Sequence, residues 1–153
     1  ITLGVETSSK YLSDLMKKGT TPDQAERSCA LLRKHGIPYF TAFLLGSEGE
    51  TLTTALDTIA FSLKLKPTLA IFNVTIPFPG TELFNKFYKD FDRPDTDWTK
   101  WTSDGLSWPY KPRQTALSGK TLWRLLIWAN LRVYLSFFQI LRSVLDMMGP
   151  DRR

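Results

Sequence analysis

The chain has 153 residues, which is the length of one ordinary domain. Hydrophobic residues make up 42% and charged residues 23%, which excludes a disordered, collagen-like or disulfide-scaffold protein. Lysine and arginine outnumber aspartate and glutamate by 20 to 15, a mild basic excess that suits an anionic partner without specifying one. The single cysteine, Cys29, and the single histidine, His35, exclude an internal disulfide, a Cys/His zinc site and an iron–sulfur cluster held by this chain alone.

Predicted strands and helices alternate over the first ninety residues. Buried, apolar strands are expected at Ile1 to Val5, Tyr39 to Leu45 and Leu69 to Thr75. Helices are expected at Tyr11 to Lys18, from Pro22 until Gly36 ends the helix, and at Thr51 to Leu65. This alternation is typical of right-handed βαβ units, so we expect an α/β fold with a parallel sheet. Three strands leave sheet edges that must be paired or covered, and the chain opens without a start or targeting signal, so we interpret it as part of a longer protein.

The predicted helices each present an apolar face. After a capping-box start at Thr21, the second helix carries an inner stripe of Ala25, Cys29 and Leu32, which predicts Cys29 as a small core residue. The third helix carries its stripe at Leu52, Ala55, Leu56, Ile59 and Leu63.

The chain changes character after residue 90. Residues 90–112 are rich in Asp, Pro, Thr and Trp, which predicts a loop that places Trp98, Trp101 and Trp108 against the main body. A final helix is expected from Ser118 to about Met148. Its polar stripe consists of Lys120, Arg124, Arg132, Gln139, Arg142 and Asp146, and the arginines interrupt any transmembrane span. Two interpretations of residues 118–148 stay open, an interfacial membrane helix or a helix that packs on protein, and we favour packing.

Polar or Gly/Pro-rich segments follow all three predicted strands. They are Glu6 to Ser9, Gly46 to Glu50 and Pro77 to Thr81. Because the carboxyl ends of parallel strands meet at one edge of the sheet, where ligands usually bind, we expect these segments to lie side by side.

Five ordered motifs carry a family resemblance. They are Gly4 to Ser9, Leu12 to Thr21, Gly36 to Pro38, Gly46 to Thr51 and Pro77 to Thr81, with looser matches at Asp97-Trp98 and Leu117 to Gly119. Together they resemble the radical S-adenosylmethionine (SAM) enzymes, in the branch with an N-terminal cobalamin-binding domain. The departures are Ser8 for a usual glycine, Ala42 for a common strand glycine, and Ser47-Glu48 for Leu-Pro, which adds a carboxylate.

The resemblance implies a particular fold and division of the chain. Residues 1–90 would be the last three βα units of a partial TIM-type (βα)6 barrel, and residues 91–153 a loop and a long helical extension. By position, Glu6 and Ser9 would contact the ribose or methionine portion of SAM, and Leu44 and Gly46 would flank its adenine.

Three sequence features also have plainer structural interpretations. Glu6 has the alternative of capping a helix or pairing with a lysine, and the resemblance favours the ligand role. Glu50 is expected to hold its loop or cap the following helix. For Pro77 to Thr81, a rigid turn and a direct ligand contact stay equally open.

The resemblance also implies chemistry. In that family a reduced [4Fe-4S] cluster cleaves SAM to a 5′-deoxyadenosyl radical, which abstracts a hydrogen. The CxxxCxxC cluster loop is absent from this sequence, and a cobalamin domain would lie outside it, so this chain alone is expected to be inactive. The full-length parent would catalyse radical methylation or rearrangement at an unactivated carbon. The alternatives are a methylthiotransferase-like enzyme without cobalamin, disfavoured by Phe78 where that branch tends to carry arginine, and a non-catalytic membrane-surface or assembly module.

These interpretations define the expected partners. They are a small-molecule or lipid-like substrate and the missing N-terminal half of the protein, with peripheral membrane contact through residues 118–148 left open. Nucleic acid is not expected, because basic residues are scattered among acidic ones. The expected location is cytoplasmic, either free or membrane-associated.

Overall fold

The computed structural model describes residues 1–91 and 112–135 and places three parallel strands in one sheet. The strands are β1 (Thr2–Glu6), β2 (Phe40–Leu45) and β3 (Leu69–Val74), in the order β1-β2-β3. All three predicted strands and the parallel sheet are confirmed, each boundary within one residue. The partial barrel stays a prediction, because the described strands form an open sheet.

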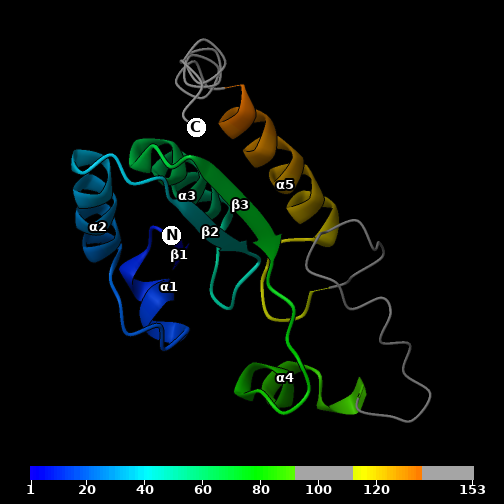
Figure 1. The fold of residues 1–153 in the computed structure, drawn as a ribbon. Coiled ribbons are helices and arrows are strands. Elements are labelled where there is room, and N and C mark those ends of the chain that lie inside the picture. The colour runs from blue at the N-terminus through cyan, green and yellow to red at the C-terminus, as the bar shows by residue number, and fades with distance from the viewer. Residues whose placement is uncertain (92–111, 136–153) are drawn as a thin grey trace.

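The helices follow the strands in βαβ fashion (Figure 1). They are α1 (Lys10–Leu15), α2 (Pro22–Lys34), α3 (Leu52–Leu65), α4 (Glu82–Phe87) and α5 (Gly119–Tyr134), with a short 3-10 turn, η1 (Lys89–Phe91), after α4. Capping boxes begin α2 at Thr21 and α3 at Thr51, and the Ser118 side chain caps α5. Helix α1 ends three residues earlier than predicted, because Lys17 takes a left-handed φ of 53°.

One face of the sheet holds the hydrophobic core. Helices α2, α3 and α5 cover this face, and α5 lies along β3 at the right of Figure 1. The buried core residues are Val5, Cys29, Tyr39, Phe43, Leu45, Ala55, Ile59, Leu65, Ala70, Phe72, Val74, Ile76, Leu117, Leu122, Leu125, Leu126, Ala129 and Val133. The predicted core position of Cys29 is confirmed.

The opposite face of the sheet is open in the described residues. Phe40 and Ile71 each keep 39% of their surface exposed, and Ala42 and Leu44 on the same face are half-buried. Since strand side chains alternate between the two faces, this pattern identifies a sheet that the described helices cover on one side.

Two burial predictions are wrong. Leu52 and Leu56 of α3 remain 48% and 38% exposed, whereas Thr58 and Ser62 of the same helix are buried. The buried face is rotated because Thr58 bonds to the segment after β1, accepting a hydrogen bond from the Ser8 backbone N–H at 3.1 Å. Strand β1 was expected to be buried, but as an edge strand of the described sheet it buries one residue, Val5.

The final helix packs on protein in its described part. Helix α5 contacts both β3 and α3, so one side of residues 119–134 packs on protein, whereas Trp123 and Trp128 of the predicted apolar arc remain exposed. No helix within residues 1–91 and 112–135 is long and apolar enough to cross a membrane. The three tryptophans predicted to lie against the main body and the helix beyond residue 135 fall outside the described residues.

Candidate functional site

A cavity of about 520 Å³ lies at the carboxyl edge of the sheet. Its lining comes from the end of α1, from β2 and the loop after it, from the segment between β3 and α4, and from α4 itself. These residues are Asp14, Leu15, Met16, Lys17, Leu44, Ser47, Glu48, Thr75, Ile76, Pro77, Phe78, Thr81, Glu82, Leu83 and Lys86. Its volume falls within the range of small-molecule sites, and its position matches the strand-end site expected for a parallel α/β fold.

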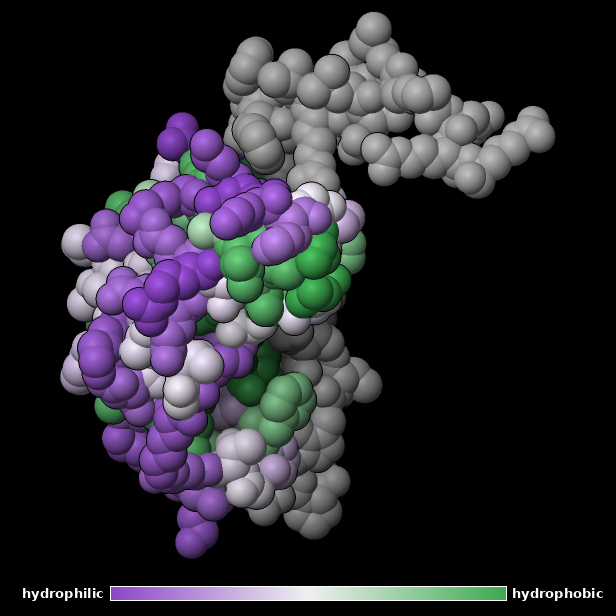
Figure 2. All heavy atoms as spheres, turned by 60° about the vertical axis from the view of Figure 1, so that its left-hand side comes forward, coloured by the Kyte–Doolittle hydropathy of each residue, from purple (hydrophilic) through white to green (hydrophobic). Residues whose placement is uncertain are grey.

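The cavity has apolar walls and a charged rim. Figure 2 shows hydrophobic side chains gathered beside a hollow, within a largely hydrophilic surface. On the rim, Lys17, just after α1, donates to Glu82 of α4 at 2.5 Å, and Lys86 of α4 pairs with Glu48 from the loop after β2. These ion pairs link α4 to both neighbouring elements, so the short helix forms one wall of the cavity.

The loop after β2 is held by a buried carboxylate. Glu50 is 1% exposed, and its Oε2 accepts a hydrogen bond from the Gly46 backbone N–H. Its other oxygen, Oε1, has no hydrogen-bond partner. Burial raises the pKa of Glu50 to about 7, although the backbone N–H groups of Gly46 and Ser47 oppose this rise. The loop-holding role predicted for Glu50 is confirmed, whereas the helix cap is Thr51.

Gly46 is fixed by contacts on the covered face. Its φ is 81°, in the left-handed region, and a Cβ placed there would lie 2.8 Å from a methyl carbon of Leu122 on α5. The close approach that requires glycine is therefore to α5. Contact of Gly46 with an adenine ring stays a prediction.

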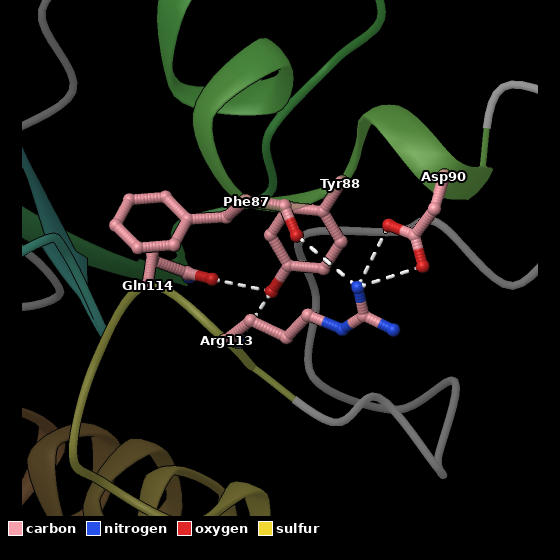
Figure 3. A network of polar contacts seen from close by, with 5 residues as sticks. All are labelled: Phe87, Tyr88, Asp90, Arg113 and Gln114. Atoms are coloured by element: carbon pink, nitrogen blue, oxygen red, sulfur yellow. Dashed lines mark hydrogen bonds and ion pairs between the residues drawn. The ribbon is translucent and has the colours of Figure 1, made fainter.

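A second network fastens α4 and the strand ends to the segment before α5 (Figure 3). The Tyr88 hydroxyl donates to Gln114 Oε1 at 2.5 Å and accepts from the Arg113 backbone N–H at 2.6 Å. The Gln114 amide then donates to the carbonyls of Gly46 at 2.8 Å and Thr75 at 3.1 Å. Gln114 is 4% exposed, so these bonds are shielded from water. They fix the relative positions of the β2 and β3 ends that line the cavity.

Glu6 ends β1 in an unusual conformation. Its φ of 68° is left-handed, which a non-glycine residue adopts at a cost of roughly 1–3 kcal/mol. Its carboxylate accepts from Lys18 Nζ at 2.8 Å, and the Glu6 side chain is 17% exposed. A Cβ at Gly4 would come within 2.6 Å of the Glu6 carboxylate and 2.8 Å of the Lys18 ammonium, so the ion pair lies directly over this glycine. The lysine-pairing alternative for Glu6 is thus present, and its role toward a ligand stays a prediction.

The structure places the four predicted ligand contacts differently. Leu44 lines the cavity, whereas Glu6, Ser9 and Gly46 are not among its lining residues. Glu6 lies opposite Phe43 in the sheet register, one residue before Leu44. The Ser9 hydroxyl accepts from the Leu12 backbone N–H at 3.3 Å and so caps α1, whose far end reaches the cavity.

Residues 77–81 form the predicted rigid turn, and their direct contact with a ligand stays a prediction. Gly80 has a φ of 85°, and the Thr81 side chain caps α4, as a rigid turn requires. Pro77 and Phe78 also line the cavity.

Some site residues had no place in the sequence-based prediction. Helix α4 has a weak signal, a Thr81 cap followed by Glu82, which could have been recognised. Gln114 has no sequence signal, because its partners lie 26, 39 and 68 residues away in the chain.

The described residues offer no cluster of three or more His, Cys, Asp or Glu side chains for a metal ion. Cys29 is fully buried, and burial raises the pKa of its thiol. A buried, protonated thiol is unsuited to cluster ligation, so any iron–sulfur cluster must take its ligands from outside the described residues.

Comparison with known proteins identifies enzymes as relatives. No model of a known protein family matches the chain. It is 29% identical over 100 residues to an uncharacterized methyltransferase of Pyrococcus horikoshii, which covers 65% of this chain and 22% of that protein. It is 30% identical over 86 residues to the anaerobic magnesium-protoporphyrin IX monomethyl ester cyclase of Rubrivivax gelatinosus, covering 56% of this chain and 16% of the cyclase. The cyclase of the same name from Cereibacter sphaeroides is also 30% identical over 86 residues, covering 56% of this chain and 14% of that protein. The chain therefore spans less than a quarter of these relatives, which are a methyltransferase and two cyclases.

Proposed function

We propose that the chain is part of a radical SAM enzyme and that SAM binds in the cavity at the carboxyl edge of the sheet. The observation that carries the proposal is the cavity itself, which lies where the motifs after β2 and β3 converge. The similarity to a methyltransferase and two cyclases supports an enzymatic parent.

The residues of the cavity fit the chemistry of SAM. Leu44, Ile76 and Phe78 supply apolar surface for an adenine ring, and the hydroxyls of Ser47 and Thr75 lie in the same wall. Three carboxylates, from Asp14, Glu48 and Glu82, line the cavity, and each pairs with a lysine, Lys10, Lys86 and Lys17 respectively. Carboxylate oxygens can also accept hydrogen bonds from the ammonium group of a ligand that takes the place of a lysine.

The chain's own contribution is binding and shielding. The Glu50 carboxylate and the Gln114 amide hold the β2 and β3 ends in place, and α4 closes one side of the cavity. When bound, a reduced [4Fe-4S] cluster supplies the electron that cleaves SAM, and its ligands lie outside this chain. The reaction class we propose for the intact protein is radical methylation or rearrangement at an unactivated carbon, with cobalamin as a further cofactor.

The test is SAM binding to the intact protein, measured by calorimetry. Leu44→Arg places a long charged side chain in the cavity and is expected to weaken binding by at least tenfold. Ile71→Arg is the matched control, because Ile71 lies on the same open face of the sheet but does not line the cavity. Equal binding by both variants and the unmodified protein would refute the cavity as the SAM site.

A separate variant tests the predicted ribose or methionine contact. Glu6→Ala should weaken SAM binding if the carboxylate contacts the ligand, and unchanged binding would assign Glu6 to its ion pair with Lys18 alone. This result is independent of the Leu44 result, so the cavity and the contact can fail separately.

A further inference from the structure

The outward face of α5 carries a large exposed apolar surface. Its exposed residues are Trp123 (43%), Ile127 (39%), Trp128 (41%), Leu131 (52%) and Tyr134 (54%), followed by Leu135 (68%) just after the helix. At 100° per residue they fall within an arc of about 140°. A group of large exposed apolar side chains on one face of a helix often marks an interaction site.

This surface is not required for the fold. Helix α5 packs through its opposite side, where Leu122, Leu125 and Leu126 join the core with Ala129 and Val133. The outward residues therefore remain exposed after the helix has made its contacts with β3 and α3. Their burial would have to come from something outside the described residues.

The charges on helix α5 indicate a partner with an anionic surface. Lys120, Arg124 and Arg132 lie within or beside the same arc, and α5 contains no aspartate or glutamate. The Arg132 guanidinium lies over the Trp128 ring, 5.4 Å from its centroid, so a cation is placed at the edge of the apolar surface. Tryptophans beside cations are the side chains enriched where a helix lies in the headgroup region of a bilayer.

We propose that the outward face of α5 docks on an anionic lipid surface, with the helix lying in the plane of the membrane. Its apolar side chains enter the boundary between headgroups and acyl chains, while the three cations contact lipid phosphates. A second copy of the chain fits this face less well, because a two-fold contact would bring the same cations together. The proposal is independent of the SAM site and stands or falls separately.

The test uses vesicle co-sedimentation of the 153-residue chain. Vesicles of phosphatidylcholine alone are compared with vesicles in which one third of the lipid is phosphatidylglycerol. We expect binding to the anionic vesicles, loss of that binding at high salt, and little binding to the neutral ones.

Two sets of variants with matched charge identify the docking face. Replacing Lys120, Arg124 and Arg132 by Gln should lower the partition coefficient roughly fivefold per cation, on the order of 100-fold in total. Replacing Arg27, Lys34 and Lys89 by Gln changes the net charge equally at exposed positions on α2 and η1, and should change binding by at most about twofold.

A third variant tests the apolar contribution. Trp123→Ser combined with Leu131→Ser should weaken binding by more than tenfold, because two exposed apolar side chains no longer enter the bilayer. Far-UV circular dichroism and the urea midpoint verify that each variant remains folded.

Four results would overturn the proposal. The first is equal binding to neutral and anionic vesicles, and the second is an equal loss of binding in both charge variants. The third is that the intact protein fails to bind vesicles that the 153-residue chain binds. The fourth is that the chain binds no vesicles and instead forms a dimer in sedimentation velocity, which the Trp123→Ser/Leu131→Ser variant abolishes. The last two would assign the face to another part of the protein or to a second copy.

Discussion

Glu50 is predicted to make the stability of the chain depend on pH. The Glu50→Gln variant keeps an oxygen to accept the Gly46 N–H but cannot ionise. In the unmodified chain the carboxyl has a folded pKa of about 7, against an ordinary value of 4.5. Between these two values the folded state binds more protons than the unfolded state, so the free energy of unfolding falls as pH rises.

The magnitude follows from the size of the pKa shift. A pKa shift from 4.5 to about 7 corresponds to a contribution of roughly 3 kcal/mol to the free energy of unfolding when the Glu50 carboxyl is protonated. Most of this contribution is lost as the pH rises from 5 to 8. The amide of the variant is uncharged at every pH in this range, so it lacks this contribution. We therefore expect the free energy of unfolding of Glu50→Gln to rise by about 2–3 kcal/mol relative to that of the unmodified chain as the pH increases from 5 to 8.

Urea unfolding followed by tryptophan fluorescence measures this difference at each pH. Glu82→Gln serves as the control, because Lys17 lowers the pKa of the exposed Glu82 carboxyl. That carboxyl is ionised in both folded and unfolded states above pH 5, so its replacement should produce no pH dependence in this range. Parallel stability curves for Glu50→Gln and the unmodified chain would refute the assignment of a buried, protonated Glu50.

Three further predictions follow from the same structure. Gly46→Ala should lower the free energy of unfolding in urea by about 2–4 kcal/mol, because the new methyl group meets a left-handed backbone and clashes with α5. Gly80→Ala, which has a left-handed backbone but free space around it, should lower it by only about 1–2 kcal/mol. Equal losses in the two variants would contradict the packing argument. Lys18→Met removes the partner of the partly buried Glu6 carboxylate at the end of β1 and should lower the free energy of unfolding by about 1 kcal/mol. Lys10→Met removes one partner of an exposed ion pair and should leave the free energy of unfolding nearly unchanged. A larger loss of stability for Lys10→Met than for Lys18→Met would contradict this reasoning. Cys29 should react with a thiol reagent at least about 100-fold more slowly in the native chain than in urea, and rapid native labelling would contradict its core position.

The sequence was most informative where structure depends on neighbouring residues. The capping box at Thr21 and the alternation of strands and helices are local signals, so the corresponding elements were predicted to within a few residues. The same is true of Cys29, whose helical stripe faces the sheet.

The sequence was least informative where structure depends on distant residues. The periodicity of α3 favoured Leu52 and Leu56 as buried, but the bonds of Thr58 to the segment after β1 turn the helix toward its polar residues. In the candidate site, only Leu44 of the four predicted contacts lines the cavity. The partners of Gln114 could not be inferred, because they depend on how the segment before α5 returns to the strand ends.

The packing of α5 on β3 has a consequence for synthesis on the ribosome. The apolar side chains of Phe72 and Val74 belong to the same core as Val133, which is synthesised about sixty residues later. At ordinary translation rates the sheet would wait roughly 3–12 s for its last covering helix. During this interval the nascent chain exposes apolar strand residues, so we expect chaperone binding to concentrate on chains that have not yet emerged beyond α5.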